Sequence, residues 1–75
     1  MAEERVRVEV AFESGQAFSA LVPLETAAEL EKRLADDDGG IVFVDAEDGR
    51  YAVALRRVAY VKRFAREARV GFGAQ

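Results

Sequence analysis

The stretch Val-Arg-Val-Glu-Val-Ala-Phe, residues 6–12, alternates apolar side chains with polar or small ones and decides the fold class. A period of two is typical of a strand with one buried face. Residues 13–16 interrupt the alternation and predict a hairpin turn, in which Gly15 is free to adopt a positive φ. A second strand is expected from Ala17 to about Val22, limited by Pro23, which donates no backbone hydrogen bond. The chain therefore opens with a β-hairpin.

The period changes after Pro23 and predicts a short helix. Thr26 and Glu29 fit a capping box, in which each side chain bonds the backbone amide of the other residue. Gly39-Gly40 is expected to end the helix. An apolar face with helical spacing should point toward the core: Ala27, Leu30 and Leu34. A helix of about ten residues is not stable alone, so it must pack on a sheet.

The rest of the chain is mostly strand-like. Residues 41–44, Ile-Val-Phe-Val, are apolar throughout and predict a central strand covered on both faces. Asp48-Gly49 is a hairpin signal, and it precedes an alternating strand over residues 51–55. The small side chains of Ala52 and Ala54 indicate a face against which the helix packs closely. Residues 58–64 suit another strand, but their apolar spacing also fits a helix over residues 57–69, and both alternatives stay open.

Together these elements predict a single α+β domain over residues 1–75. We expect a small antiparallel, strongly curved sheet in the order β-β-α-β-β-β, with one helix packed on it. A chain of 75 residues has room for one domain, and it hides only about 60% of the surface that its unfolded form exposes. The core is therefore expected to be marginal.

The composition excludes most catalytic chemistry. The chain has no Cys and no His, which removes thiolate metal sites and the commonest general base. Asp36-Asp37-Asp38 cannot all converge on one ion because the three residues are adjacent. We therefore expect no enzyme, no cofactor and no metal. The uncharged stretch Gln16–Leu24 is far shorter than the roughly 20 residues that cross a bilayer, so we expect no membrane span and a cytoplasmic location.

Charge is distributed unevenly along the chain. Residues 1–49 carry thirteen acids and four bases, whereas residues 50–75 carry seven bases and one acid. The basic segment has three interpretations: a solvated face, a surface that meets acidic residues of the same fold or of a second copy, or a surface for nucleic acid. The overall charge of −3 counts against nucleic acid, because distant acids repel the phosphate backbone.

We expect a non-enzymatic interaction module that acts as a homo-oligomer, since association is one way for so small a chain to bury more surface. A larger protein partner stays open. The residues expected at the contact between copies are Val70, Phe72, Arg63, Arg66 and Arg69. The alternative is binding of RNA or single-stranded DNA by a largely overlapping set: Arg56, Arg57, Tyr60, Lys62, Arg63, Phe64, Arg66 and Arg69.

The motif Val58-Ala59-Tyr60-Val61, followed by Arg-Val-Gly-Phe-Gly-Ala at residues 69–74, resembles a family of short actinobacterial proteins of unknown function. The resemblance covers nearly the whole chain, and its closing motif is its most specific part. It implies a similar small fold and favours a strand over residues 58–64, but it implies no activity. This chain departs from the family at residues 62–66, which are basic where the family is acidic or neutral.

Overall fold

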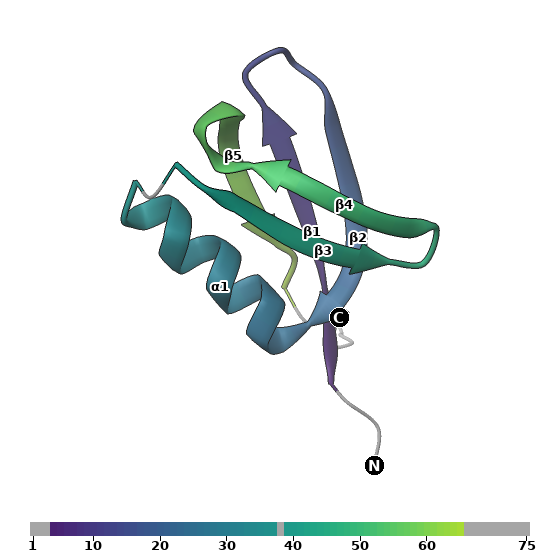
Figure 1. Cartoon of the computed structure of the whole chain (residues 1–75). Coiled ribbons are helices and arrows are strands. Elements are labelled where there is room, and N and C mark those ends of the chain that lie inside the picture. Colours follow the sequence, from purple (N-terminus) through teal and green to yellow (C-terminus); the bar gives the residue numbers. More distant parts are fainter. Residues whose placement is uncertain (1–3, 38, 66–75) are drawn as a thin grey trace, which may run out of the picture.

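A computed structural model of the chain describes residues 4–37 and 39–65, and this part of the chain contains one α-helix and five strands. In chain order these are β1 (Arg5–Phe12), β2 (Ala17–Pro23), α1 (Leu24–Ala35), β3 (Ile41–Ala46), β4 (Gly49–Ala54) and β5 (Val58–Arg63) (Figure 1). A short 3-10 helix, η1 (Leu55–Arg57), precedes β5. All strand pairs are antiparallel, so the predicted α+β class is confirmed.

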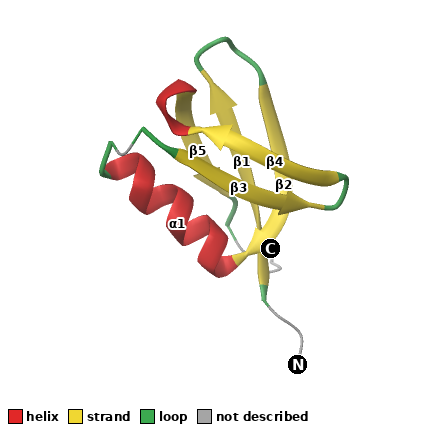
Figure 2. Ribbon diagram, in the orientation of Figure 1, coloured by secondary structure: helices red, strands yellow, loops and turns green. Residues whose placement is uncertain are grey.

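The strands divide between two sheets, one in the order β2-β1-β5 and the other formed by β3 and β4. In Figure 2 the β3–β4 hairpin crosses over the larger sheet. The helix α1 packs against the larger sheet, where it contacts β1, β2 and β5. The expectation of one strongly curved sheet is therefore wrong, because there are two sheets and neither closes or curls strongly. The apolar inner face of the hairpin packs against the inner face of β1 and β2, as sheets in layered folds do.

The segment after residue 57 forms a strand. β5 pairs with β1, so that Arg63 lies opposite Val8 and Tyr60 lies opposite Ala11. The register shifts between Ala11 and Phe12, where Val58 is the opposite residue. The strand alternative is confirmed for residues 58–63, and the helical alternative is wrong there.

The helix begins earlier than the sequence predicts. Its N-cap is Pro23 rather than Thr26, and no side chain caps it, so the predicted capping box is wrong. The physical reason is that β2 runs directly into α1. The amide of Leu24 donates to the carbonyl oxygen of Glu4 at 3.3 Å, so β1 satisfies one of the amides at the helix start. The helix also ends earlier, at Ala35, before Gly39-Gly40.

The core contains side chains from both sheets and from the predicted face of α1. It consists of Val8, Val10, Ala20, Val22, Ala27, Leu30, Val42, Val44, Val53, Leu55 and Val58, with Leu34 partly buried beside it. One prediction fails here. Only alternate residues of β3 are buried, since Ile41 and Phe43 are 53% and 59% exposed. Ala52 and Ala54 face them across the hairpin, on the face that is turned away from the core. The prediction that the helix packs against these two alanines is therefore also wrong, because α1 packs on β1, β2 and β5.

Candidate functional site

The structure places the predicted site residues in different surroundings. Arg63 is bound within its own fold: its Nε and Nη2 donate to the two carboxylate oxygens of Glu31 on α1, at 2.9 and 3.0 Å. Arg56 and Arg57 are exposed on η1, at the start of β5. Four predicted contact residues lie outside the described residues: Arg66, Arg69, Val70 and Phe72.

The face of the larger sheet that is turned away from the core has three cross-strand rows. The strand registers place Ala17, Ala11 and Tyr60 in one row, and Ser19, Glu9 and Lys62 in the next. Leu21 and Arg7 continue the pattern, and the Phe64 amide donates to the Arg7 carbonyl oxygen at 3.0 Å. We call the part of this face that is formed by Arg7, Glu9, Tyr60, Lys62 and Phe64 the β1–β5 outer face.

Two contacts order the side chains of the β1–β5 outer face. The Tyr60 hydroxyl, on a side chain 48% exposed, donates to a carboxylate oxygen of Glu9 at 2.8 Å. This hydrogen bond and the negative charge of Glu9 raise the pKa of Tyr60. The ammonium group of Lys62 lies over the Phe64 ring, 4.5 Å from its centroid. Two aromatic rings and a cation therefore follow one another at alternate positions: Tyr60 and Lys62 on β5, and Phe64 just after it.

The cations differ in whether they have acidic partners. Ion pairs connect basic and acidic side chains at several places in the described part of the chain: Lys32–Asp36, Arg33–Glu29, Arg50–Asp45 and Arg63–Glu31. Glu29–Arg33 is the helical pair that four-residue spacing favours. Within residues 4–37 and 39–65, five cations of β1, η1 and β5 form no ion pair with a carboxylate: Arg5, Arg7, Arg56, Arg57 and Lys62.

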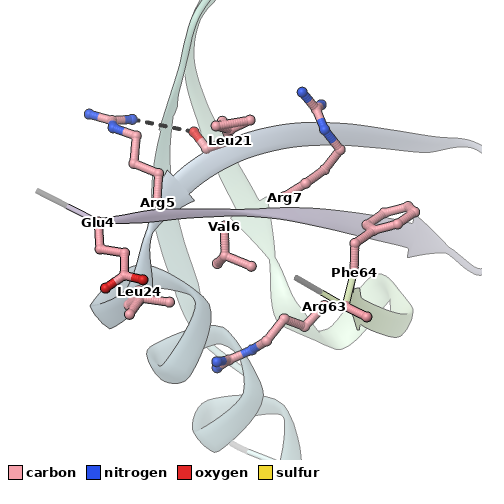
Figure 3. Close-up of a pocket in the computed structure, with 9 residues that line it drawn as sticks. Glu4, Arg5, Val6, Arg7, Leu21, Leu24, Arg63 and Phe64 are labelled. Atoms are coloured by element: carbon pink, nitrogen blue, oxygen red, sulfur yellow. Dashed lines mark hydrogen bonds between the residues drawn. The ribbon is translucent and has the colours of Figure 1, made fainter. Parts of the chain in front are cut away.

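A pocket of about 620 Å³ lies at the N-terminal end of β1, where the strand begins (Figure 3). We call it the pocket at the end of β1. In Figure 3, Arg5, Arg7 and Leu21 lie on one side of β1, and Val6 and Leu24 lie on the other. The Arg5 guanidinium donates to the Leu21 carbonyl oxygen at 3.4 Å. The lining is completed by Glu4 and by the end of β5: Arg63, Phe64 and Ala65. The sequence alone could not indicate this pocket, because it is formed by segments far apart in the chain.

The pocket lies beside an open strand edge. Successive residues of an antiparallel strand direct their backbone groups to opposite neighbours. The Glu4 carbonyl bonds Leu24, on the β2 side, and the Arg7 carbonyl bonds Phe64, on the β5 side. Arg5 therefore presents its amide and carbonyl on the β5 side. β5 ends at Arg63, and no described residue pairs with Arg5 on that side.

The second exposed feature is an apolar strip on the outer face of the β3–β4 hairpin. Ile41 and Phe43 lie opposite Ala54 and Ala52, respectively. Arg50 forms an ion pair with Asp45, with 2.9 Å between its Nε and a carboxylate oxygen. The Arg50 guanidinium also lies over the Phe43 ring, 5.4 Å from the ring centroid. The apolar strip could have been recognised in the sequence, because residues 41–44 are apolar at every position. We interpreted this run instead as a strand that is buried on both faces.

The described residues offer little reactive chemistry. No group of three acidic side chains among residues 4–37 and 39–65 is arranged to hold a metal ion. No described helix is long and apolar enough to span a membrane. The described residues define an antiparallel α+β protein in which no described residue pairs with the start of β1 on the β5 side, and in which the outer face of the larger sheet carries basic side chains. No family model, curated protein or solved structure matches the chain, so the resemblance to the short actinobacterial family stays a prediction.

Proposed function

We propose that this protein is a small non-enzymatic interaction module that associates with a second copy of itself. In this proposal, the segment over residues 66–75 of one copy occupies the pocket at the end of β1 in the other. The observation that carries it is the pocket itself, an apolar hollow beside the Arg5 backbone, which no described residue pairs on the β5 side, and lined in part by Ala65, which precedes the segment in sequence.

The chemistry of the segment fits that of the pocket. Val70 and Phe72 alternate with Gly71 and Gly73, so a strand would place both apolar side chains on one face. The pocket has apolar lining on both sides of β1, and Val6 and Leu24 share the side that the apolar face of the added strand would contact. Adding a strand to an open edge supplies main-chain hydrogen bonds, while pockets for alternate side chains supply specificity. Leu24, which is 39% exposed, would lose contact with water in the complex.

A second copy fits the pocket better than the segment of the same chain does. If β5 continued in its present register, Arg66 would lie opposite Arg5, and like charges in directly opposed positions are destabilising. Residues 66–69, Arg-Glu-Ala-Arg, contain none of the residues that favour a tight turn back. Each chain has one pocket and one such segment, so a reciprocal exchange forms a closed dimer with two-fold symmetry.

The remaining predicted contact residues have a place in this arrangement. Arg66 and Arg69 would precede the inserted apolar residues and meet acidic side chains of the second copy. Arg63 forms part of the pocket wall while its guanidinium stays on Glu31, so we assign it a structural contribution. The alternative of a larger protein partner would use the same pocket with a foreign apolar segment.

Light scattering coupled to size exclusion tests the proposal. We expect the full chain to have twice its mass of 8.2 kDa at high micromolar concentration, and Leu24→Asp and Phe72→Asp to have the monomer mass. Aspartate at position 24 lies at the start of α1, where the helix dipole favours it, so the variant should fold. Phe43→Asp is the control, because it removes a more exposed apolar side chain from the other sheet.

Two results would contradict the proposal. A monomeric wild type would exclude self-association. A wild-type dimer that Phe43→Asp dissociates and Leu24→Asp leaves intact would move the contact to the apolar strip of the hairpin. Circular dichroism of each variant separates loss of association from loss of folding.

A further inference from the structure

The cations of the described chain that lack a carboxylate partner belong to β1, to β5 and to η1, which directly precedes β5, and Arg5 of β1 is one of them. Those of α1 and the β3–β4 hairpin are neutralised by ion pairs, as is Arg63. Arg7 and Lys62 belong to the β1–β5 outer face, and Arg56 and Arg57 lie at the start of β5. Although the whole chain has a charge of −3, this local arrangement leaves a positive field over one face.

The β1–β5 outer face also carries two aromatic rings, those of Tyr60 and Phe64. Tyr60 lies beside the small side chains of Ala11 and Ala17, which leave the surface next to its ring flat. Phe64 lies two positions beyond Lys62 and is partly buried. Single-stranded nucleic acids are bound by this combination, in which aromatic rings stack on bases and nearby cations contact phosphates.

We propose that the β1–β5 outer face binds single-stranded nucleic acid. Tyr60 and Phe64 stack on two bases, while Lys62 and Arg7 contact the phosphates between them. Residues four apart along a strand are separated by roughly 13 Å, because each residue adds about 3.3 Å. That distance spans about two extended nucleotides, so the rings match bases that are not adjacent.

Glu9 has a defined part in this arrangement. Its carboxylate accepts the hydroxyl hydrogen bond of Tyr60 and holds the ring in place, but its charge repels phosphate. The bound strand therefore follows the side of Lys62 and Arg7. Replacing Glu9 by glutamine keeps an acceptor oxygen for Tyr60 and removes the charge, so the variant Glu9→Gln should bind more tightly than wild type.

Fluorescence anisotropy of labelled oligo-dT and oligo-U, each of about 12 nucleotides, tests the proposal on the full chain. We expect binding at low salt that weakens on the order of tenfold when salt rises fourfold, the slope for two or three phosphates on a single strand. Tyr60→Ala should weaken binding about tenfold, whereas Tyr60→Phe, which keeps the ring, should retain it. Lys62→Ala should weaken binding and reduce the salt dependence.

Matched controls come from other faces. Lys32→Ala removes an exposed lysine from α1, and Phe43→Ala removes an exposed ring from the hairpin, and neither should change affinity. Arg7 and Phe64 line the pocket at the end of β1, but Tyr60 and Lys62 do not, so the variants of Tyr60 and Lys62 test nucleic-acid binding separately from self-association, and Leu24→Asp should still bind. Absence of binding at low salt would overturn the proposal, as would equal affinity of wild type, Tyr60→Ala and Lys62→Ala.

Discussion

Arg63 on β5 and Glu31 on α1 form a bidentate ion pair, with nitrogen–oxygen distances of 2.9 and 3.0 Å. The two residues are 32 positions apart, so the pair connects the helix to the last strand of the larger sheet. Planar guanidinium groups are suited to this geometry, because two parallel N–H donors meet both carboxylate oxygens. The pair therefore orients α1 on the sheet.

We expect Glu31→Gln to lower the free energy of unfolding by about 0.5–1 kcal/mol, since both side chains are partly exposed and solvent screens the pair. Urea denaturation at low and high salt measures it, and the loss should be smaller at high salt. Lys32→Gln is the control, because the Lys32–Asp36 pair is 76% and 58% exposed and should contribute little. Equal losses for both variants would show that Arg63–Glu31 is an ordinary surface pair.

The sequence could not assign Arg63 correctly. Its position in a basic segment left open acids of the same fold, acids of a second copy and nucleic acid, because a charge pattern contains no information about which acid lies near it after folding. Glu31 is exposed on α1, outside the predicted apolar face of the helix. Only the pairing of β5 with β1 and the placement of α1 bring the two residues together.

Two adjacent residues of β3, Phe43 and Val44, provide a second prediction about the free energy of unfolding. Val44→Ala should lower the free energy of unfolding by about 2 kcal/mol, because Val44 is fully buried and the variant loses two methyl groups from the core. Phe43→Ala removes a much larger side chain but should cost less than about 0.5 kcal/mol, since Phe43 is 59% exposed. Denaturant midpoints at constant slope measure both changes. A larger loss for Phe43 would mean that a second copy or another segment covers the strip.

The same strand shows where sequence reasoning reached its limit. The alternation of residues 6–12 correctly predicted one buried and one exposed face of β1, since a polar or small residue stood at every second position. Residues 41–44 lack such polar positions, so periodicity could not reveal that only one face is covered. The early start of α1 was also missed, because the amide of Leu24 is satisfied by Glu4, a residue distant in sequence.

The two tyrosines provide a prediction about pH. The hydrogen bonds that they donate, Tyr60 to Glu9 and Tyr51 to Asp48, raise both pKa values above 10. A raised folded-state pKa contributes stability below pH 10 that is lost as the pH rises through that folded pKa. Glu9→Gln should lower the pKa of Tyr60 alone, and Asp48→Asn that of Tyr51 alone. Tyrosinate absorbance, assigned with Tyr60→Phe, measures both, and a Glu9→Gln titration identical to wild type would contradict the Tyr60–Glu9 bond.

The end of α1 contains a residue whose replacement should stabilise the fold. Asp37 has a φ of 56°, in the left-handed region, and its amide donates to the Leu34 carbonyl oxygen at 3.1 Å. This conformation costs an L-residue about 1 kcal/mol, whereas glycine adopts it freely and is common at this position after a helix. The Asp37 carboxylate is also close to the negative end of the helix dipole. Both effects favour its replacement.

Asp37→Gly should therefore raise the free energy of unfolding by about 1 kcal/mol, which corresponds to a Tm increase of about 4–8 °C in a domain of this size. Asp37→Asn separates the two causes, because asparagine removes the charge but keeps a side chain that tolerates the left-handed region. Gly39→Ala is the opposite control: Gly39 has a φ of 74° and open space where a Cβ would lie, so any loss there comes from the backbone conformation alone. If Asp37→Gly lowered the Tm, the entropy that glycine adds to the unfolded chain would exceed the relief of strain, and the conformation of Asp37 would not be a significant cost to this fold.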